Sequence, residues 1–250
     1  MNVHIVLAHP SPTSLCASLC DEAVAFLTAN GHEVTVSDLY AMKWKAVADY
    51  DDLGSHTDGT YIDASGEAYR DGGLSEDIRT EQARIEAADA VVLLFPLWWF
   101  SMPAIMKGWV DRVLVNGLGY GTTRGWKRYG DGAYAGKRGM VITAAGGSET
   151  VLSERGVSGS ITDILWPINH GILYYTGMDV LEPHVVTSAV TVDSDRYQNL
   201  VAELRERLEG LETDEPIAYR SQAGGDYDER RRLKPGRERP GTSGFDLHIA

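Results

Sequence analysis

The sequence has 250 residues, of which 43% are hydrophobic and 24% are charged. This is enough for one large folded domain, and the proportions argue against wholesale disorder and against a fibrous structure. The formal net charge of −13 argues against nucleic acid or an anionic membrane surface as partner, because both would be repelled, and favours a small ligand in a cleft.

The N-terminal region predicts a strand, a polar loop and a helix. The strand is Val3–Ala8, and neither a basic leader nor a long apolar stretch precedes it. We therefore expect a cytoplasmic protein without a membrane span. The loop that begins at His9 leads into a helix from about Ser14, which Asn30-Gly31 terminates.

The two cysteines, Cys16 and Cys20, lie four residues apart in this expected helix. Their spacing is neither the Cys-x-x-Cys redox motif nor a zinc pattern, and the seven histidines are scattered. We expect neither a disulfide framework nor a structural metal.

Further strands and helices alternate up to about residue 211. Ala90–Phe95 is a continuous apolar run, as expected for a central strand that is buried on both faces. The other expected elements are a strand at Glu33–Val36, a polar excursion over Ser37–Leu74, a helix from Ser75, a helix from Pro103 towards Val115, a strand at Gly139–Ala144, a helix near Ile161–Tyr175, a fifth strand among Met178–Val190 and a helix at Asp193–Leu211. This alternation predicts an α/β fold with a parallel sheet and helices on both faces. We expect one domain over residues 1–212 and an extended C-terminal tail over residues 213–250, where Gly, Pro, Arg and Asp predominate.

The loops after the first, third and fourth strands are the expected site, because open doubly wound sheets bind ligands beyond the carboxyl ends of their strands. The first loop offers His9, Ser11, Thr13 and Ser14 ahead of a helix N-terminus, where free amides, hydroxyls and the helix dipole can hold a phosphate. The alternative is that Thr13 or Ser14 only caps the helix. The Gly-x-Gly-x-x-Gly pattern is absent, which argues against a nicotinamide-binding Rossmann domain.

The other two loops carry aromatic residues and glycines. Trp98, Trp99 and Phe100 follow the third strand, where flat rings can wall a planar ligand such as a flavin while backbone amides bond its edge. The alternative is that they pack in the core or in an interface, although their position at a strand end favours a site. Gly146-Gly147 follows the fourth strand and allows close approach of a ligand, although a Gly-Gly pair also occurs in ordinary loops.

Longer motifs extend this pattern over most of the chain. They include Ile5-Val6-Leu7-Ala8-His9, Ser37-Asp38-Leu39-Tyr40-Ala41-Met42, Phe95-Pro96-Leu97-x-Trp99-Phe100, Pro103-Ala104-Ile105-x-Lys107-Gly108-Trp109, Gly146-Gly147-Ser148, Ile164-Leu165-Trp166-Pro167-Ile168 and Val180-Leu181-Glu182-Pro183. With these motifs, in order from residue 5 to residue 183, the sequence resembles the NAD(P)H:quinone oxidoreductase family, the DT-diaphorase type of flavodoxin-like flavoprotein. The resemblance implies a flavodoxin-like, doubly wound, five-stranded parallel sheet with helices on both faces. It also implies a homodimer and a ping-pong reaction, in which NAD(P)H reduces a bound flavin and a quinone-like acceptor then takes two electrons.

The resemblance also assigns roles to individual residues. It places His9, Thr13, Ser14, Leu15, Cys16 and Ala17 at the flavin's phosphate chain, Pro96, Leu97, Trp99 and Phe100 along the isoalloxazine, Gly146 and Gly147, preceded by Ala144 and Ala145, at its pyrimidine side, and Arg196 at an adenosine. Trp99, Phe100, Gly146 and Gly147 would surround the reacting ring, and Tyr120 and Tyr175 would shape the pocket for nicotinamide and quinone. Beside the flavin, Leu152 and Ser158 stand where animal members have a tyrosine and a histidine. Leucine has no proton to donate, and a serine hydroxyl cannot carry the positive charge of an imidazole.

The length of the chain bears on the cofactor. The excursion over Ser37–Leu74 and the tail beyond Glu212 exceed a minimal flavodoxin-like unit, and the resemblance implies that such additions cover an adenosine, which favours FAD over FMN. Three other functions stay open: azo or nitro reduction, regulation of a potassium-efflux system, and single-electron transfer by a flavodoxin-like carrier.

Overall fold

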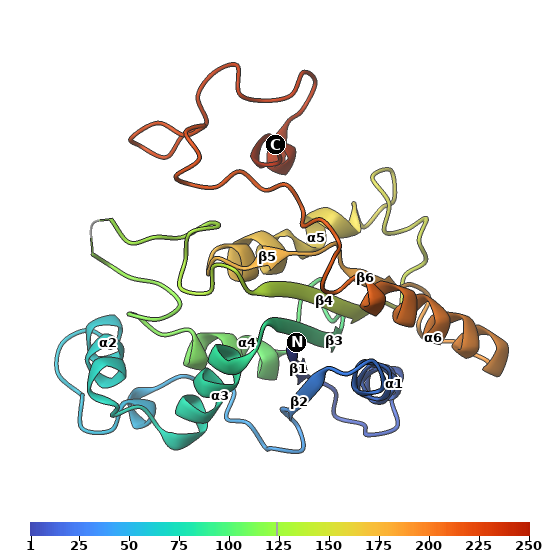
Figure 1. The fold of residues 1–250 in the computed structure, drawn as a ribbon, viewed down its shortest axis with the longest axis horizontal. Helices are drawn as coiled ribbons and strands as arrows, with labels where there is room; N and C mark the ends of the chain where they lie inside the picture. The colour runs from blue at the N-terminus through green and yellow to red at the C-terminus, as the bar shows by residue number, and fades with distance from the viewer. Residues whose placement is uncertain (124) are drawn as a thin grey trace.

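A computed structural model describes residues 1–123 and 125–250 and contains one six-stranded parallel sheet at its centre (Figure 1). The strand order is β2-β1-β3-β4-β5, and β6 also pairs with β4. The strands are β1 (Asn2–Leu7), β2 (Glu33–Asp38), β3 (Ala90–Pro96), β4 (Arg138–Ala144), β5 (Asp179–Val180) and β6 (His184–Val186). The order reverses between β1 and β3, which is the doubly wound arrangement of a flavodoxin-like fold.

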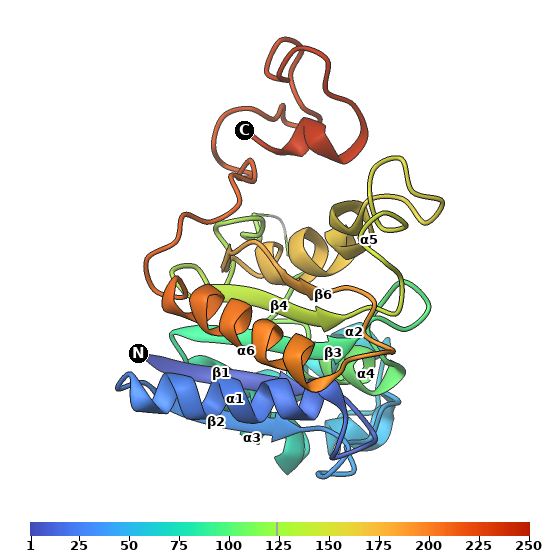
Figure 2. The same cartoon turned by 90° about the vertical axis from the view of Figure 1, so that its right-hand side faces the viewer.

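Helices cover both faces of this sheet. Figure 2 shows α1 (Leu15–Ala29) and α6 (Ser194–Glu209) side by side on one face. The other face carries α3 (Glu76–Ala87), α4 (Ala104–Val113) and α5 (Ile161–Ile168). Successive residues of a strand point to opposite faces, so Val92 of β3 packs in the α1/α6 core and Val91 and Leu93 pack in the other core. This explains why β3 is apolar along its whole length.

The fifth position of the sheet corrects the sequence expectation, because two short strands replace one. β5 pairs with the start of β4 at Arg138 and Gly139, and β6 pairs with its end. Pro183 lies between them and has no N–H to donate to a ladder, so the strand is interrupted there.

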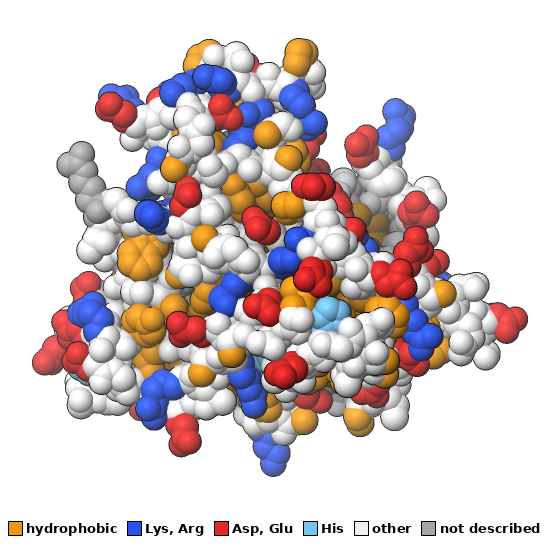
Figure 3. Space-filling view, viewed as in Figure 1, with side chains coloured by type: hydrophobic (Ala, Val, Ile, Leu, Met, Phe, Trp, Pro, Cys, Tyr) orange, Lys and Arg blue, Asp and Glu red, His pale blue; other side chains and the backbone are white. Residues whose placement is uncertain are grey.

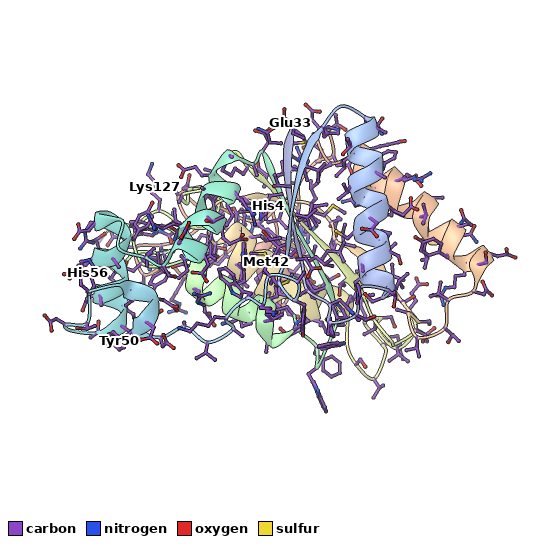
Figure 4. The ribbon with its side chains drawn as sticks, turned by 90° about the horizontal axis from the view of Figure 1, so that it is seen from below. His4, Glu33, Met42, Tyr50, His56 and Lys127 are labelled. Atoms are coloured by element: carbon purple, nitrogen blue, oxygen red, sulfur yellow. The ribbon has the colours of Figure 1, made fainter. Side chains whose placement is uncertain are left out.

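The excursion over Ser37–Leu74 also differs from the expectation, because it contains a helix, α2 (Tyr61–Asp71). The side chain of Thr60 caps its first turn, and Gly72 ends it with a φ of 71°. A 3-10 turn, Tyr50–Leu53, precedes it. In Figure 4, His4 lies in the interior beside the sheet, whereas Tyr50 and His56 lie at one edge of the molecule, on this excursion.

Two further segments are the connection between β4 and β5 and the C-terminal segment. The helix expected near Ile161–Tyr175 is α5 followed by a π-helical stretch, Asn169–Tyr174. Residues 213–250 contain no α-helix and only one 3-10 turn, Gly244–His248, and arch over α5 (Figure 1). Within the described ranges, no helix has the length and apolar character that crossing a membrane requires.

Candidate functional site

The three loops expected to form the site leave adjacent strands at the same edge of the sheet. Leu7 pairs with Leu94, and Pro96 pairs with Ala144, so β1, β3 and β4 end close together. The amide of Leu97 donates to the carbonyl of Ala144 at 2.9 Å. The ring centroids of His9 and Trp98 are 5.9 Å apart, which brings the first and second loops into contact.

The first loop ends at the N-terminus of α1. Ser14 is the cap, as the alternative interpretation expected: its Oγ accepts from the amide of Ala17 at 3.1 Å. Capping satisfies only that amide, and those of Leu15 and Cys16 precede the first hydrogen bonds of the helix and have no acceptor within it. These amides and the helix dipole can therefore hold a phosphate. The thiol of Cys16 takes no part as a nucleophile, since burial raises its pKa to about 12.

The second loop is a two-residue hairpin turn with an unusual sequence. Trp98 and Ser101 exchange backbone hydrogen bonds of 2.9 and 3.0 Å. Trp99 and Phe100 between them have φ values of 50° and 61°, as in a type I′ turn, for which Asn-Gly is the favoured pair. Trp99 is 95% exposed and Phe100 is 55% exposed, so the interpretation that these rings pack in the core is wrong. The turn presents two flat apolar rings to the outside.

The third loop places its two glycines close to apolar side chains. An added Cβ would lie 3.3 Å from Val190 at Gly146 and 3.4 Å from Leu152 at Gly147. Neither residue has a positive φ, so the backbone conformation does not require glycine at either position. In the part of the chain that the structure describes, no acceptor pairs with their amides.

Tyr120 and Tyr175 line one cavity, to which none of the three loops contributes a lining residue. Both line a cavity of about 790 Å³ that also includes Val47, Tyr61 and Ile172. Burial raises the pKa of Tyr120, which keeps its hydroxyl protonated at neutral pH. Tyr175 packs edge-on against Tyr129, with ring centroids 5.0 Å apart.

Leu152 and Arg196 line another cavity, of about 500 Å³. The guanidinium of Arg196 donates to the carbonyls of Ser188 and Thr191, each at 2.9 Å, so it also fixes the loop before α6. The amide of Ser158 donates to the carbonyl of Val151 at 3.3 Å, within the loop that leads to α5. Of the two residues that differ from the animal members, Leu152 lies next to Gly147.

The resemblance assigns no role to two further contributors to this site. Trp98 contacts His9, and Ser101 closes the turn that exposes Trp99 and Phe100. Both residues lie inside the aromatic motif. A contact between rings of two distant loops has no local sequence signal, and a turn of the Asn-Gly type is not expected where the sequence has neither residue.

The arrangement fits a flavin. Exposed flat rings can cover an isoalloxazine, the amides of Gly146 and Gly147 are available to its edge, and the N-terminus of α1 can take a phosphate. No group of three or more His, Cys, Asp or Glu side chains gathers to hold a metal ion among residues 1–123 and 125–250.

Comparisons with known proteins agree with this fold. A family model described as a flavodoxin-like fold matches residues 1–208. The chain is 46% identical over 235 residues to the ribosyldihydronicotinamide dehydrogenase-like protein traD of Penicillium crustosum, covering 91% of this chain and 87% of that protein. It is 39% identical over 219 residues to NAD(P)H dehydrogenase [quinone] 1 of Rattus norvegicus, covering 86% and 79%. A solved structure from Klebsiella pneumoniae, of a protein proposed to be a quinone reductase, matches all of both chains with 46% identity and a TM-score of 0.96.

Proposed function

The chain belongs to the flavodoxin-like NAD(P)H:quinone oxidoreductase family, and on that premise we propose that it moves two electrons from NAD(P)H through a bound flavin to a quinone. The observation that carries the proposal is the turn at Trp98–Ser101. It presents Trp99 and Phe100 at the edge of the sheet where α1 begins and where the Gly146-Gly147 loop lies.

The residues of this chain bind and enclose the reacting groups. A bound flavin supplies the hydride acceptor and donor for both half-reactions. Trp99 and Phe100 provide flat apolar walls that exclude water and orient a planar acceptor. The amides of Leu15 and Cys16 hold the phosphate. Because Leu152 has no proton to donate, the amides of Gly146 and Gly147 are left to stabilise negative charge at the reacting centre.

The test is a spectrum of the purified protein followed by steady-state kinetics. A flavin absorbance band and NAD(P)H-dependent quinone reduction with parallel initial-rate lines are expected. Replacing both Trp99 and Phe100 with alanine should lower turnover sharply while the circular dichroism spectrum stays unchanged. Unchanged kinetics in this double variant would refute the role of the turn, and a protein that binds no flavin would refute the whole assignment.

We propose FAD rather than FMN as the flavin. The cavity of about 500 Å³ beside Arg196 supports this, because it adjoins the Gly146-Gly147 loop through Leu152 and offers room for an adenosine. The sequence resemblance supports it through the added segments. Mass spectrometry of the heat-released flavin tests the choice, and FMN as the sole species would refute it.

We propose a homodimer in which Tyr120 and Tyr175 of one subunit complete the site of the other. In the described residues, neither tyrosine has an aromatic contact with Trp98, Trp99 or Phe100, although the resemblance assigns them all to one pocket. A second copy supplies the missing half without any rearrangement of the fold.

We propose a cytoplasmic location. Both cysteines are free, and unpaired thiols suit a reducing compartment. Cell fractionation with antibodies against the protein would test this, and recovery outside the cytoplasmic fraction would contradict it.

A further inference from the structure

The C-terminal segment closes on itself instead of trailing away. Tyr219 and Ile249 form an antiparallel bridge, and the amide of Ala250 donates to the carbonyl of Ala218 at 2.7 Å. The closed loop is far longer than the roughly 12–15 residues beyond which connections without regular structure become uncommon and are usually functional or disordered. This loop has defined hydrogen bonds at its base, which is typical of a functional loop rather than a disordered one.

That inner surface encloses a cavity of about 290 Å³ against the body of the protein. The body contributes Trp166, His170 and Tyr129, and the loop contributes Phe245, Gln222 and Arg231 among its lining residues. The ring of Phe245 stacks on Trp166 with ring centroids 4.7 Å apart and an angle of 9° between planes, and the ring of His170 also stacks on Trp166, with centroids 4.3 Å apart. The cavity is at the lower end of the range for small-molecule sites, which suits one or two fused rings.

Two polar groups in this cavity lack the partners that such groups usually have. The Oε1 atom of Gln222 is buried and accepts no hydrogen bond from the described residues. Arg231 is exposed at the cavity, and no carboxylate pairs with it in residues 1–123 and 125–250, whereas Arg220 is paired with Asp226. A buried acceptor without a donor is costly, so a ligand that donates to it would be favoured.

The charge around the cavity also differs from that of the rest of the molecule. The chain as a whole carries a formal charge of −13, yet the seven basic side chains of residues 213–250 balance seven acidic ones. Figure 3 shows Lys and Arg side chains gathered over this segment at the top of the molecule. An anion that the protein repels elsewhere is therefore tolerated here.

We propose that this cavity binds a planar aromatic acid that carries a ring hydroxyl, separately from the flavin site. The rings of Trp166, Phe245 and Tyr129 border the aromatic body, Arg231 pairs with the acid group, and Oε1 of Gln222 accepts from the hydroxyl. Burial lowers the pKa of His170 to about 4, so this lining ring is neutral at pH 7. The site shares no residue with the loops at Trp98–Ser101 and Gly146-Gly147.

Calorimetric titration of the flavin-bound full-length protein with hydroxynaphthoate tests the proposal. Arg231→Gln should weaken binding roughly tenfold, since a charge-assisted contact is lost. Arg232→Gln is the matched control, because it removes the same charge from the adjacent residue, which is not among those that line the cavity. Equal affinity in the two variants would overturn the proposal.

The hydroxyl and the position of the site are tested separately. Naphthoate without the hydroxyl should bind several-fold more weakly to the unmodified protein, and Gln222→Leu should abolish that difference. An unchanged difference in this variant, with the fold verified by thermal melting, would overturn the role of Gln222. Saturating quinone should not displace hydroxynaphthoate, and competitive displacement would show binding in the substrate pocket and overturn the separate site.

Discussion

Trp99 and Phe100 hold backbone conformations that side chains of their kind seldom adopt. Each residue with a φ near 50–60° costs about 1–3 kcal/mol, and such strain persists where the surroundings enforce it. Here the two hydrogen bonds between Trp98 and Ser101 enforce it, and the result is a pair of rings turned outwards. The turn is therefore less stable than one without this strain, and it holds the two rings exposed.

Replacing Trp99-Phe100 with Asn-Gly should therefore raise the stability of the flavin-free protein. Asn-Gly fits this turn without strain, and each kcal/mol gained shifts the unfolding temperature by about 2–4 °C in a chain of this size. Calorimetry of the flavin-free protein should show an increase of several degrees, while quinone reduction is lost. The double alanine variant is the control, because it removes the rings but retains the strained backbone. Equal unfolding temperatures in the two variants would contradict the strain.

Glu81 is a fully buried carboxylate with several donors. Its Oε1 accepts from Ser37 at 2.9 Å and from Arg84 at 2.7 Å, and its Oε2 accepts from Trp109 at 2.7 Å. Burial alone would raise the pKa of Glu81, but the neighbouring His4, at 3.7 Å, and the hydrogen bonds from Trp109 and Ser37 lower it below its ordinary value of 4.5. The network ties α3 and α4 to the sheet.

The Glu81→Gln variant should lose about 2–3 kcal/mol of unfolding free energy at pH 7, because hydrogen bonds to a charged acceptor are lost. Since the pKa is lower in the folded state, the stabilisation is present above pH 4.5 and is lost as the pH falls through the folded-state pKa. Urea unfolding should be measured at pH 7 and at progressively lower pH. The difference in unfolding free energy between the variant and the unmodified protein should shrink as the pH falls. Glu86→Gln, on the exposed side of α3, should change little, and a loss independent of pH would contradict the mechanism.

The sequence predicts those parts of the site whose position depends on where the strands end. The three loops follow apolar strands, and parallel strands end at a common edge, so His9, Phe100 and Gly147 were expected near one another. The turn at Trp99 and Phe100 was not predictable, since its conformation opposes the local preferences of both residues. The separation of Tyr120 and Tyr175 from these loops depends on tertiary structure alone.

Among the elements, α4 is held to the excursion by Arg112. This buried guanidinium donates from Nε and Nη2 to the two oxygens of Asp52, at 3.0 and 2.9 Å, and Nη2 lies 2.8 Å from Asp77. The Cζ atom of Arg112 also lies 4.4 Å from the ring centroid of Trp44. A planar fork that bonds one carboxylate twice cannot be reproduced by lysine.

Arg112→Met should destabilise the protein by about 3–5 kcal/mol, because it removes the cation of a buried pair and leaves the carboxylate of Asp52 without its two-fold donor. The expected result is a large decrease in the urea midpoint. Lys107→Ala, which breaks the exposed pair with Asp111 on the same helix, is the control and should cost about 0–1 kcal/mol. Similar losses in both variants would show that Arg112 acts as an ordinary surface residue.

The boundaries of the elements were predictable where a local signal marks them. Ser14 and Ser75 precede α1 and α3, as expected. The sequence does not predict the helix α2 although Thr60 and Gly72 bound it, because the excursion that contains it is polar. The division of the last strand into β5 and β6 depends on pairing with β4, which no local pattern reports.

At the scale of the whole molecule, the cavity lined by Tyr120 and Tyr175 and the exposed rings of Trp99 and Phe100 have no cover from the described residues. Val47 and Trp99 are exposed, and Val47 lines the cavity that contains Tyr120 and Tyr175. We expect a homodimer in sedimentation velocity, with each copy covering these surfaces of the other. Val47→Glu should shift the equilibrium towards monomer and lower quinone reduction, whereas Val157→Glu, at another exposed valine, should do neither. A fully active monomer would contradict this prediction.

The split at Pro183 has a consequence for solubility at high concentration. An edge strand with a long row of unpaired amides and carbonyls can pair with another molecule and start aggregation. Beside β4 this edge consists of β5, with two residues, and β6, with three, and a proline separates them. The opposite edge, β2, begins with Glu33 and ends with Asp38, so like charges meet when two such edges approach. Both margins of the sheet thus discourage its growth from one molecule into the next.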